Sequence, residues 1–223
     1  MNRRGLIAVV CGLFLELATP VHGQTALPVV DEADFAPLRE QCQRLLKAFD
    51  TLKVPLAADV DKELRKLIAA GAADPKEPAT KLQKLLDRRC LVGVSINPES
   101  RVKAARGPGD ADLILDQPVY VLIKVHNDAG VTAALAVHGP QLRSAGKAGA
   151  EQWLEAAVVG EPPLSAKLSG GKVDYLLLRL TAREAGKREA TLQFDVGQGT
   201  QDLGFRAEVP ILFTVSKPPA PKP

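Results

Sequence analysis

The spacing of apolar residues changes near Cys90, and this change constrains the fold more than any other feature. Before it, apolar residues recur every three or four positions, as on one face of a helix. After it, apolar and polar residues alternate, as on the two faces of a strand. The chain is therefore predicted to be α+β, with a helical hairpin or bundle over 24–90 and a β-domain over 91–215.

Three helices are predicted in the first part. One covers 31–52, the second follows Pro55 and stops near Gly71, and the third opens at Glu77-Pro78, where the missing N–H of a proline is harmless. Their apolar faces are expected to form core. These faces consist of Phe35, Leu38, Cys42, Leu45, Leu46, Phe49 and Leu52, then Val60, Leu64, Leu67 and Ile68, then Leu82, Leu85, Leu86 and Cys90.

The second part contains strands separated by turn residues. Turn sequences at 128–130 and 184–186 predict two hairpins, and no long helix separates the strands, so an antiparallel immunoglobulin-like β-sandwich is expected. Pro210 suits an edge or a bulge, and Trp153 and Tyr175 are expected in the core. The predicted strands are 91–98, 118–128, 131–137, 173–181, 189–196 and 205–215, with 152–158 and 164–168 as further candidates.

The N-terminus reads "MNRRGLIAVVCGLFLELATPVHGQT". Two arginines, a short apolar run and small residues follow in the order of a secretory signal peptide, so residues 1–23 are expected to be removed and the protein to be secreted or periplasmic. No later apolar run reaches the roughly 18 residues that a membrane-spanning helix needs. The proline-rich tail 216–223 is expected to be extended.

Charge excludes some partners. The chain has 29 basic and 26 acidic residues, and removal of the signal peptide takes away two arginines and one glutamate. The remainder is close to neutral, and the basic residues Arg101, Lys103 and Arg106 have no aromatic neighbours. We therefore expect no nucleic-acid partner and no integral membrane segment, but an unknown protein or glycan partner.

Cys42 and Cys90 remain after removal of the signal peptide. In an oxidising compartment an even pair first suggests a disulfide, which would contribute about 4 kcal/mol by chain-entropy arithmetic. Small buried apolar residues are the other interpretation. If it forms, the disulfide joins the first helix to the end of the third.

Catalytic motifs are mostly absent. The sequence has no HExxH, GxSxG, CxxC or GxxxxGK[ST]. His126 and His138 with Asp128 would suit zinc or copper, but no third ligand has diagnostic spacing, so surface histidines are the favoured interpretation. Ser144, Ser165 and Ser169 lack a nucleophile-elbow pattern. No enzyme, cofactor or metal is predicted.

The stretch "GQGTQDLGF" at 197–205 is the most site-like segment. Its glycine spacing differs from the dinucleotide fingerprint, and a strand follows where phosphate binding needs a helix. Gly197 and Gly199 are therefore expected to adopt positive φ in a hairpin connection, with Gly204 easing entry to the last strand. Residues 200–202 would form the exposed tip.

The segments "INPESRVKAARGPG", "LIKVHNDAGVTAAL" and "AGKREATLQFDVGQGTQDLGFRAEVPILF" carry a family likeness. They resemble the non-catalytic N-terminal region ahead of PHP-type metal-dependent hydrolase domains in some secreted bacterial proteins. These residues are expected to include no hydrolase domain, because none of that domain's catalytic residues can be placed on them. The resemblance implies an accessory module.

The leading hypothesis is a secreted, non-catalytic binding or scaffolding module, and it includes an accessory role beside an extracytoplasmic hydrolase. Loops at one end of a sandwich often carry recognition. One alternative is a structural or oligomerising envelope protein that uses its helical face, and the other is a metal-dependent hydrolase. The recognition-loop candidates are Asn127, Asp128, Thr200, Gln201 and Asp202.

Overall fold

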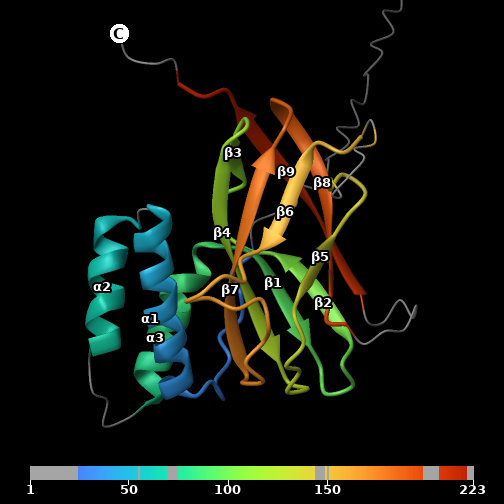
Figure 1. The fold of residues 1–223 in the computed structure, drawn as a ribbon. Coiled ribbons are helices and arrows are strands. Elements are labelled where there is room, and N and C mark those ends of the chain that lie inside the picture. Colours follow the sequence, from blue (N-terminus) through green and yellow to red (C-terminus); the bar gives the residue numbers. More distant parts are fainter. Residues whose placement is uncertain are drawn as a thin grey trace, which may run out of the picture.

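The computed structural model describes residues 25–54, 56–69, 75–143, 149, 151–197 and 206–219. It is an α+β fold, as predicted, and Figure 1 shows the three helices together on one side of the strands. The helices are α1 (Phe35–Leu52), α2 (Ala58–Ala69) and α3 (Lys76–Asp87). The strands are β1 (Cys90–Ile96), β2 (Val102–Arg106), β3 (Asp112–Ile114), β4 (Pro118–Asn127), β5 (Ala136–His138), β6 (Leu154–Val158), β7 (Val173–Ala182), β8 (Gly186–Asp195) and β9 (Arg206–Ser216).

The strands form two mixed sheets, so the prediction of an antiparallel sandwich was wrong. One sheet has the order β2-β1-β4-β7-β6 and the other β3-β9-β8-β5. β1 runs parallel to β4, and β3 runs parallel to β9. After β2 the chain visits β3 in the other sheet before it returns as β4, and this detour brings β4 back alongside β1 in the same direction.

Both predicted short hairpins were also wrong. β5 pairs with β8 instead of β4, and β8 pairs with β9 and β5 instead of β7. Gly130 and Gly186 do adopt positive φ, of 67° and 106°. Their turns pass the chain from one sheet to the other, so a turn residue marked a reversal without indicating the partner strand.

The connection after β8 is a hairpin, as expected. Asp195 lies opposite Arg206 in an antiparallel pair, and Gly197 has φ 70°. The rest of "GQGTQDLGF", including Thr200, Gln201 and Asp202, lies outside the described residues. At Pro210, β9 has β8 on one side, while β3 pairs only further along the strand, so the expectation of an edge position is confirmed.

The five-stranded sheet is covered on both faces. Ile123 and Leu178 belong to the core between the two sheets, whereas Leu122 and Leu177 pack against the helices. This explains why β7 is apolar on both of its faces. The apolar faces predicted for the helices are mostly buried in this second core, which the helical and β-parts share.

Trp153 and Tyr175 are buried, as expected, at 4% and 1% exposure. The Trp153 ring meets Phe213 edge-on, with 5.9 Å between ring centroids. Of the further strand candidates, 152–158 contains β6, whereas 164–168 contributes an isolated bridge between Ala134 and Lys167.

The disulfide predicted between Cys42 and Cys90 is absent from the structure, where both carry free thiols. Both are fully buried in the core beneath the helices, and the Cys90 thiol donates to the Leu86 carbonyl at 3.5 Å. Burial raises the pKa of the Cys42 thiol to about 12. These are the properties of small buried apolar residues.

No helix within the described residues is long and apolar enough to cross a membrane. The predicted signal peptide, 1–23, and the tail end, 220–223, lie outside the described residues.

Candidate binding pocket

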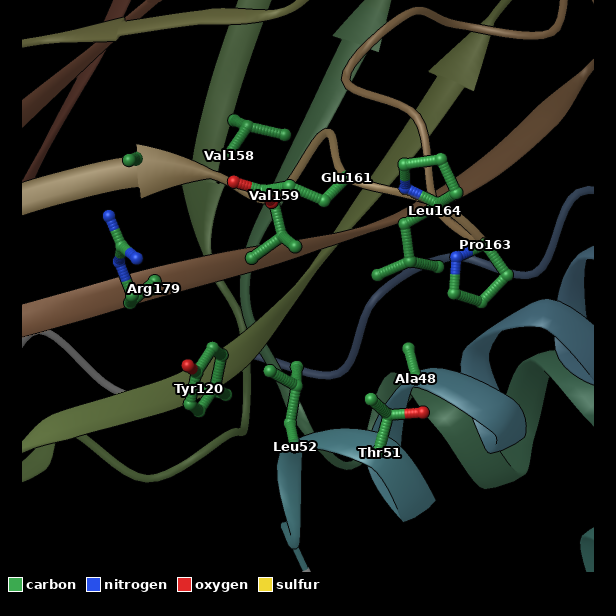
Figure 2. Close-up of a pocket in the computed structure, with 12 residues that line it drawn as sticks. Ala48, Thr51, Leu52, Tyr120, Val158, Val159, Glu161, Pro163, Leu164 and Arg179 are labelled. Carbon is green, nitrogen blue, oxygen red and sulfur yellow. The ribbon is translucent and has the colours of Figure 1, made fainter.

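A pocket of about 290 Å³ lies where the end of α1 meets β4, β6 and β7 (Figure 2). It is built from four segments that are far apart in the sequence. The lining residues are Ala48, Thr51 and Leu52 from α1, Tyr120 from β4, Ala157, Val158, Val159, Glu161, Pro162, Pro163 and Leu164 from β6 and the chain after it, and Arg179 from β7.

The pocket begins where helical cover of the sheet stops. α1 ends at Leu52, and Lys53 follows with φ 55°, a left-handed conformation that turns the chain away. Tyr175 and Leu177 face the helices, and alternation along β7 places Arg179 on the same face. Arg179 is exposed, and it lines the pocket together with the last residues of α1.

The pocket has an apolar side. Ala48 and Leu52 come from α1, and Val159 and Leu164, from the chain after β6, face them. Pro163 adds an apolar ring, and this ring fixes the backbone φ of the residue. An apolar wall of this kind favours ligands that bring apolar surface of their own.

The polar side holds groups without a partner. Within the described part of the chain, the side chains of Arg179, Tyr120 and Glu161 make no hydrogen bond or ion pair. In Figure 2 the Glu161 carboxylate reaches back over Val159, toward the side of the pocket where Arg179 lies. Tyr120 is the cross-strand neighbour of Arg179. The pocket therefore combines an unneutralised cation, a phenol and an unneutralised carboxylate.

A second polar group lies on the same sheet face, beneath the helices. Lys124 Nζ donates to Asp87 Oδ2 and to the Pro28 carbonyl, both at 2.8 Å, and the Tyr175 hydroxyl donates to Asp87 Oδ1 at 2.7 Å. Burial raises the pKa of Asp87 and raises that of Tyr175 well above its usual range. All three side chains are buried and partnered, so this network has a structural role.

Sequence reasoning missed both polar groups. A lysine within the apolar run "VLIKV" was a usable signal for the network, because a strand buried on both faces must partner such a charge. The pocket has no comparable signal, since its residues are assembled only by the tertiary fold.

The predicted recognition residues of the 127–130 loop are already engaged. Asn127 is 1% exposed, and its side chain donates to the Val131 carbonyl at 2.8 Å and accepts from the Val131 N–H at 3.0 Å. Asp128 pairs with Lys172 at 2.8 Å and with His126 at 3.3 Å. The hydrogen bond from Lys172 lowers the pKa of Asp128. The Asn127 side chain therefore stabilises the turn that it belongs to.

The two histidines do not come together. His126 lies on β4 of one sheet and His138 on β5 of the other, where it pairs with Asp195 at 3.1 Å. Among the described residues no group of three or more His, Cys, Asp or Glu side chains could hold a metal ion. Ser165 and Ser169 accept hydrogen bonds from nearby loop N–H groups, and Ser144 lies outside the described residues.

Comparison with known proteins adds little. No protein-family model and no curated protein matches the chain. Among solved structures, the chain is similar to one described as the structure of PbICP-C in complex with falcipain-2, at 12% identity and a TM-score of 0.28. That match covers 47% of this chain and 84% of the other. A TM-score this low does not indicate a shared fold.

Proposed function

We propose that this protein is a secreted or periplasmic, non-catalytic binding module whose ligand site is the pocket at the end of α1. The observation that carries the proposal is the gathering of Arg179, Tyr120 and Glu161, all without partners, around one concavity with an apolar wall. Default ligand sites in proteins combine apolar walls with a few convergent polar groups.

The chemistry of the pocket favours binding over catalysis. Nucleophilic catalysis needs a nucleophile within hydrogen-bond reach of a base. The hydroxyl of Thr51, the one aliphatic hydroxyl lining the pocket, donates instead to the Lys47 carbonyl of its own helix at 2.8 Å. An accessory role beside an extracytoplasmic hydrolase follows only from the family resemblance and belongs to the same proposal.

The layering supports a scaffolding role as well. Two facing sheets resemble the core of an immunoglobulin-like domain, here with two parallel strand pairs and a helical layer on one side. The alternative of association through the helical face is less favoured, because the apolar faces of the helices are used inside the chain. Their outer faces carry ion pairs such as Arg65–Asp61 and Lys81–Glu77.

The test has two parts. The intact mass of the protein from its native cell fraction is expected to correspond to a chain starting at Gln24, outside the cytoplasm. A thermal-shift panel of amino acids, sugars, nucleotides, fatty acids and peptides is expected to raise the melting temperature for one class, while a hydrolase panel shows no turnover.

Three results would contradict the proposal. These are a full-length cytoplasmic protein, a panel in which no class raises the melting temperature, or turnover that Glu161→Gln abolishes. Glu189→Gln is the matched control, because Glu189 is an exposed glutamate on β8 of the other sheet.

A further inference from the structure

We infer that the pocket at the end of α1 binds a small zwitterion with an apolar body, of the chemical class of an apolar α-amino acid. This inference rests on the proposed binding function and names the ligand class for the same site.

Strands β4 and β7 carry two cation–tyrosine pairs. Lys124 of β4 lies opposite Tyr175 of β7, and four residues along each strand Tyr120 of β4 lies opposite Arg179 of β7. Both pairs face the helical side of the sheet. In the first pair, one carboxylate joins the two groups, since Asp87 accepts from both Lys124 and Tyr175.

The second pair also combines a cation with a phenol, but no carboxylate of the described residues joins them. No described residue of the chain donates to or accepts from the side chains of Arg179 or Tyr120. A guanidinium presents a planar set of donors that matches a carboxylate in two-point fashion. The carboxylate of a ligand would therefore occupy at Arg179 and Tyr120 the place that Asp87 takes at Lys124 and Tyr175.

Glu161 defines the other end of the ligand. Its carboxylate lines the same pocket and has no partner within the described residues. A purely anionic ligand would be repelled by Glu161, whereas a ligand ammonium would pair with it. An ammonium and a carboxylate on one small molecule satisfy both unpaired charges together.

The volume and the apolar wall of the pocket indicate the size and the apolar character of the ligand. A volume of about 290 Å³ is near the lower end of the roughly 300–1,000 Å³ typical of ligand pockets, so it suits a small ligand such as a single amino acid. The apolar wall from Leu52, Val159 and Leu164 would take an aliphatic side chain.

Calorimetry on the mature chain with three matched probes tests the inference. L-leucine carries both charges, isocaproate lacks the ammonium and isoamylamine lacks the carboxylate. Leucine is expected to bind at least about tenfold more tightly than either single-charge probe, because each charge-assisted contact contributes that much.

The variants assign the charges to residues. Arg179→Gln is expected to weaken leucine at least about tenfold and to leave isoamylamine unchanged, whereas Glu161→Gln weakens leucine and leaves isocaproate unchanged or tighter. Arg183→Gln is the matched control for Arg179, because Arg183 is exposed and paired with Glu155 and Asp116 away from the pocket.

Three outcomes overturn the inference. Wild-type protein that binds none of the three probes, leucine binding that survives Arg179→Gln, or isocaproate binding as tight as leucine would each do so. Stabilisation of the same protein by another class in the thermal-shift panel would then leave the binding function in place and discard only the ligand class.

Discussion

Two cation–tyrosine pairs on β4 and β7 differ in burial and in hydrogen bonding. Lys124 and Tyr175 lie under the helices, share Asp87 and are almost entirely buried. Tyr120 and Arg179 lie past the end of α1 and keep their polar atoms unpaired within the described residues. Both pairs combine a cation with a phenol. The pair that the helices cover stabilises the fold, and the pair that they leave uncovered remains accessible to a ligand.

The covered pair, Lys124 and Tyr175, should contribute most to stability. Lys124→Met leaves the Asp87 carboxylate buried without its cation, and the free energy of unfolding is expected to fall by about 3–5 kcal/mol. Urea unfolding of the variant against wild type measures this. Adding Asp87→Asn to Lys124→Met is expected to restore part of the loss, because the unpaired charge is gone. A loss under 1 kcal/mol in the single variant would mean that the network does not hold the helices to the sheet.

The thiols beside the covered pair should be strongly protected. Cys42 and Cys90 are fully buried, and burial raises the pKa of both thiols, that of Cys42 to about 12. Thiol reagents at mild alkaline pH are expected to label the folded protein at least about a hundredfold more slowly than the urea-unfolded chain. Unfolding without reductant should then expose two thiols. A count of zero would instead reveal the disulfide that the sequence suggested.

A single amide on α1 should contribute less. Gln41 accepts from the Tyr175 N–H at 2.8 Å and donates to Asp174 Oδ1 at 2.9 Å. Gln41→Ala leaves both β7 groups without these partners, and we expect it to lower the free energy of unfolding by about 1–3 kcal/mol. Lys47→Ala on the exposed side of the same helix is the control, and an equal effect of the two substitutions would argue against the contact.

Asp174 should make the free energy of unfolding depend on pH. Burial raises the pKa of Asp174 above its ordinary value of 3.8. The folded chain therefore binds this proton more tightly than the unfolded chain, so the associated stability is complete below pH 3.8 and is lost as pH rises through the folded pKa. The slope cannot exceed about 1.4 kcal/mol per pH unit for one group.

Urea unfolding across this acidic range compares wild type with Asp174→Asn. The variant should show a shallower decline with rising pH, because it has no carboxyl at this position. Identical slopes in the two proteins would assign the pH dependence to other groups.

The contrast between the two pairs also shows what the sequence could predict. The helices, most strands and the buried faces were predictable because periodicity is local, as at Leu45 and Ile123. Strand partners were not, because the turn at 128–130 has the same residues whether it closes a hairpin or crosses between sheets. The pocket was beyond sequence reasoning, since the tertiary fold brings Arg179 together with Leu52 of α1 and with Glu161.

The two charged side chains of the pocket should contribute least to stability. Arg179 and Glu161 are exposed and make no side-chain ion pair or hydrogen bond within the described residues. Arg179→Met and Glu161→Gln are therefore expected to change the free energy of unfolding by less than about 0.5 kcal/mol. The pair Arg179→Met and Lys124→Met is the sharpest comparison, because each replaces a cation on the same sheet face by the same apolar residue. Similar losses in both would show that Arg179 is part of the framework and would remove the reason for assigning it to a ligand. A large loss of stability in Lys124→Met with none in Arg179→Met would show that the Lys124–Tyr175 pair supports the fold. It would also show that the Tyr120–Arg179 pair on the same two strands does not.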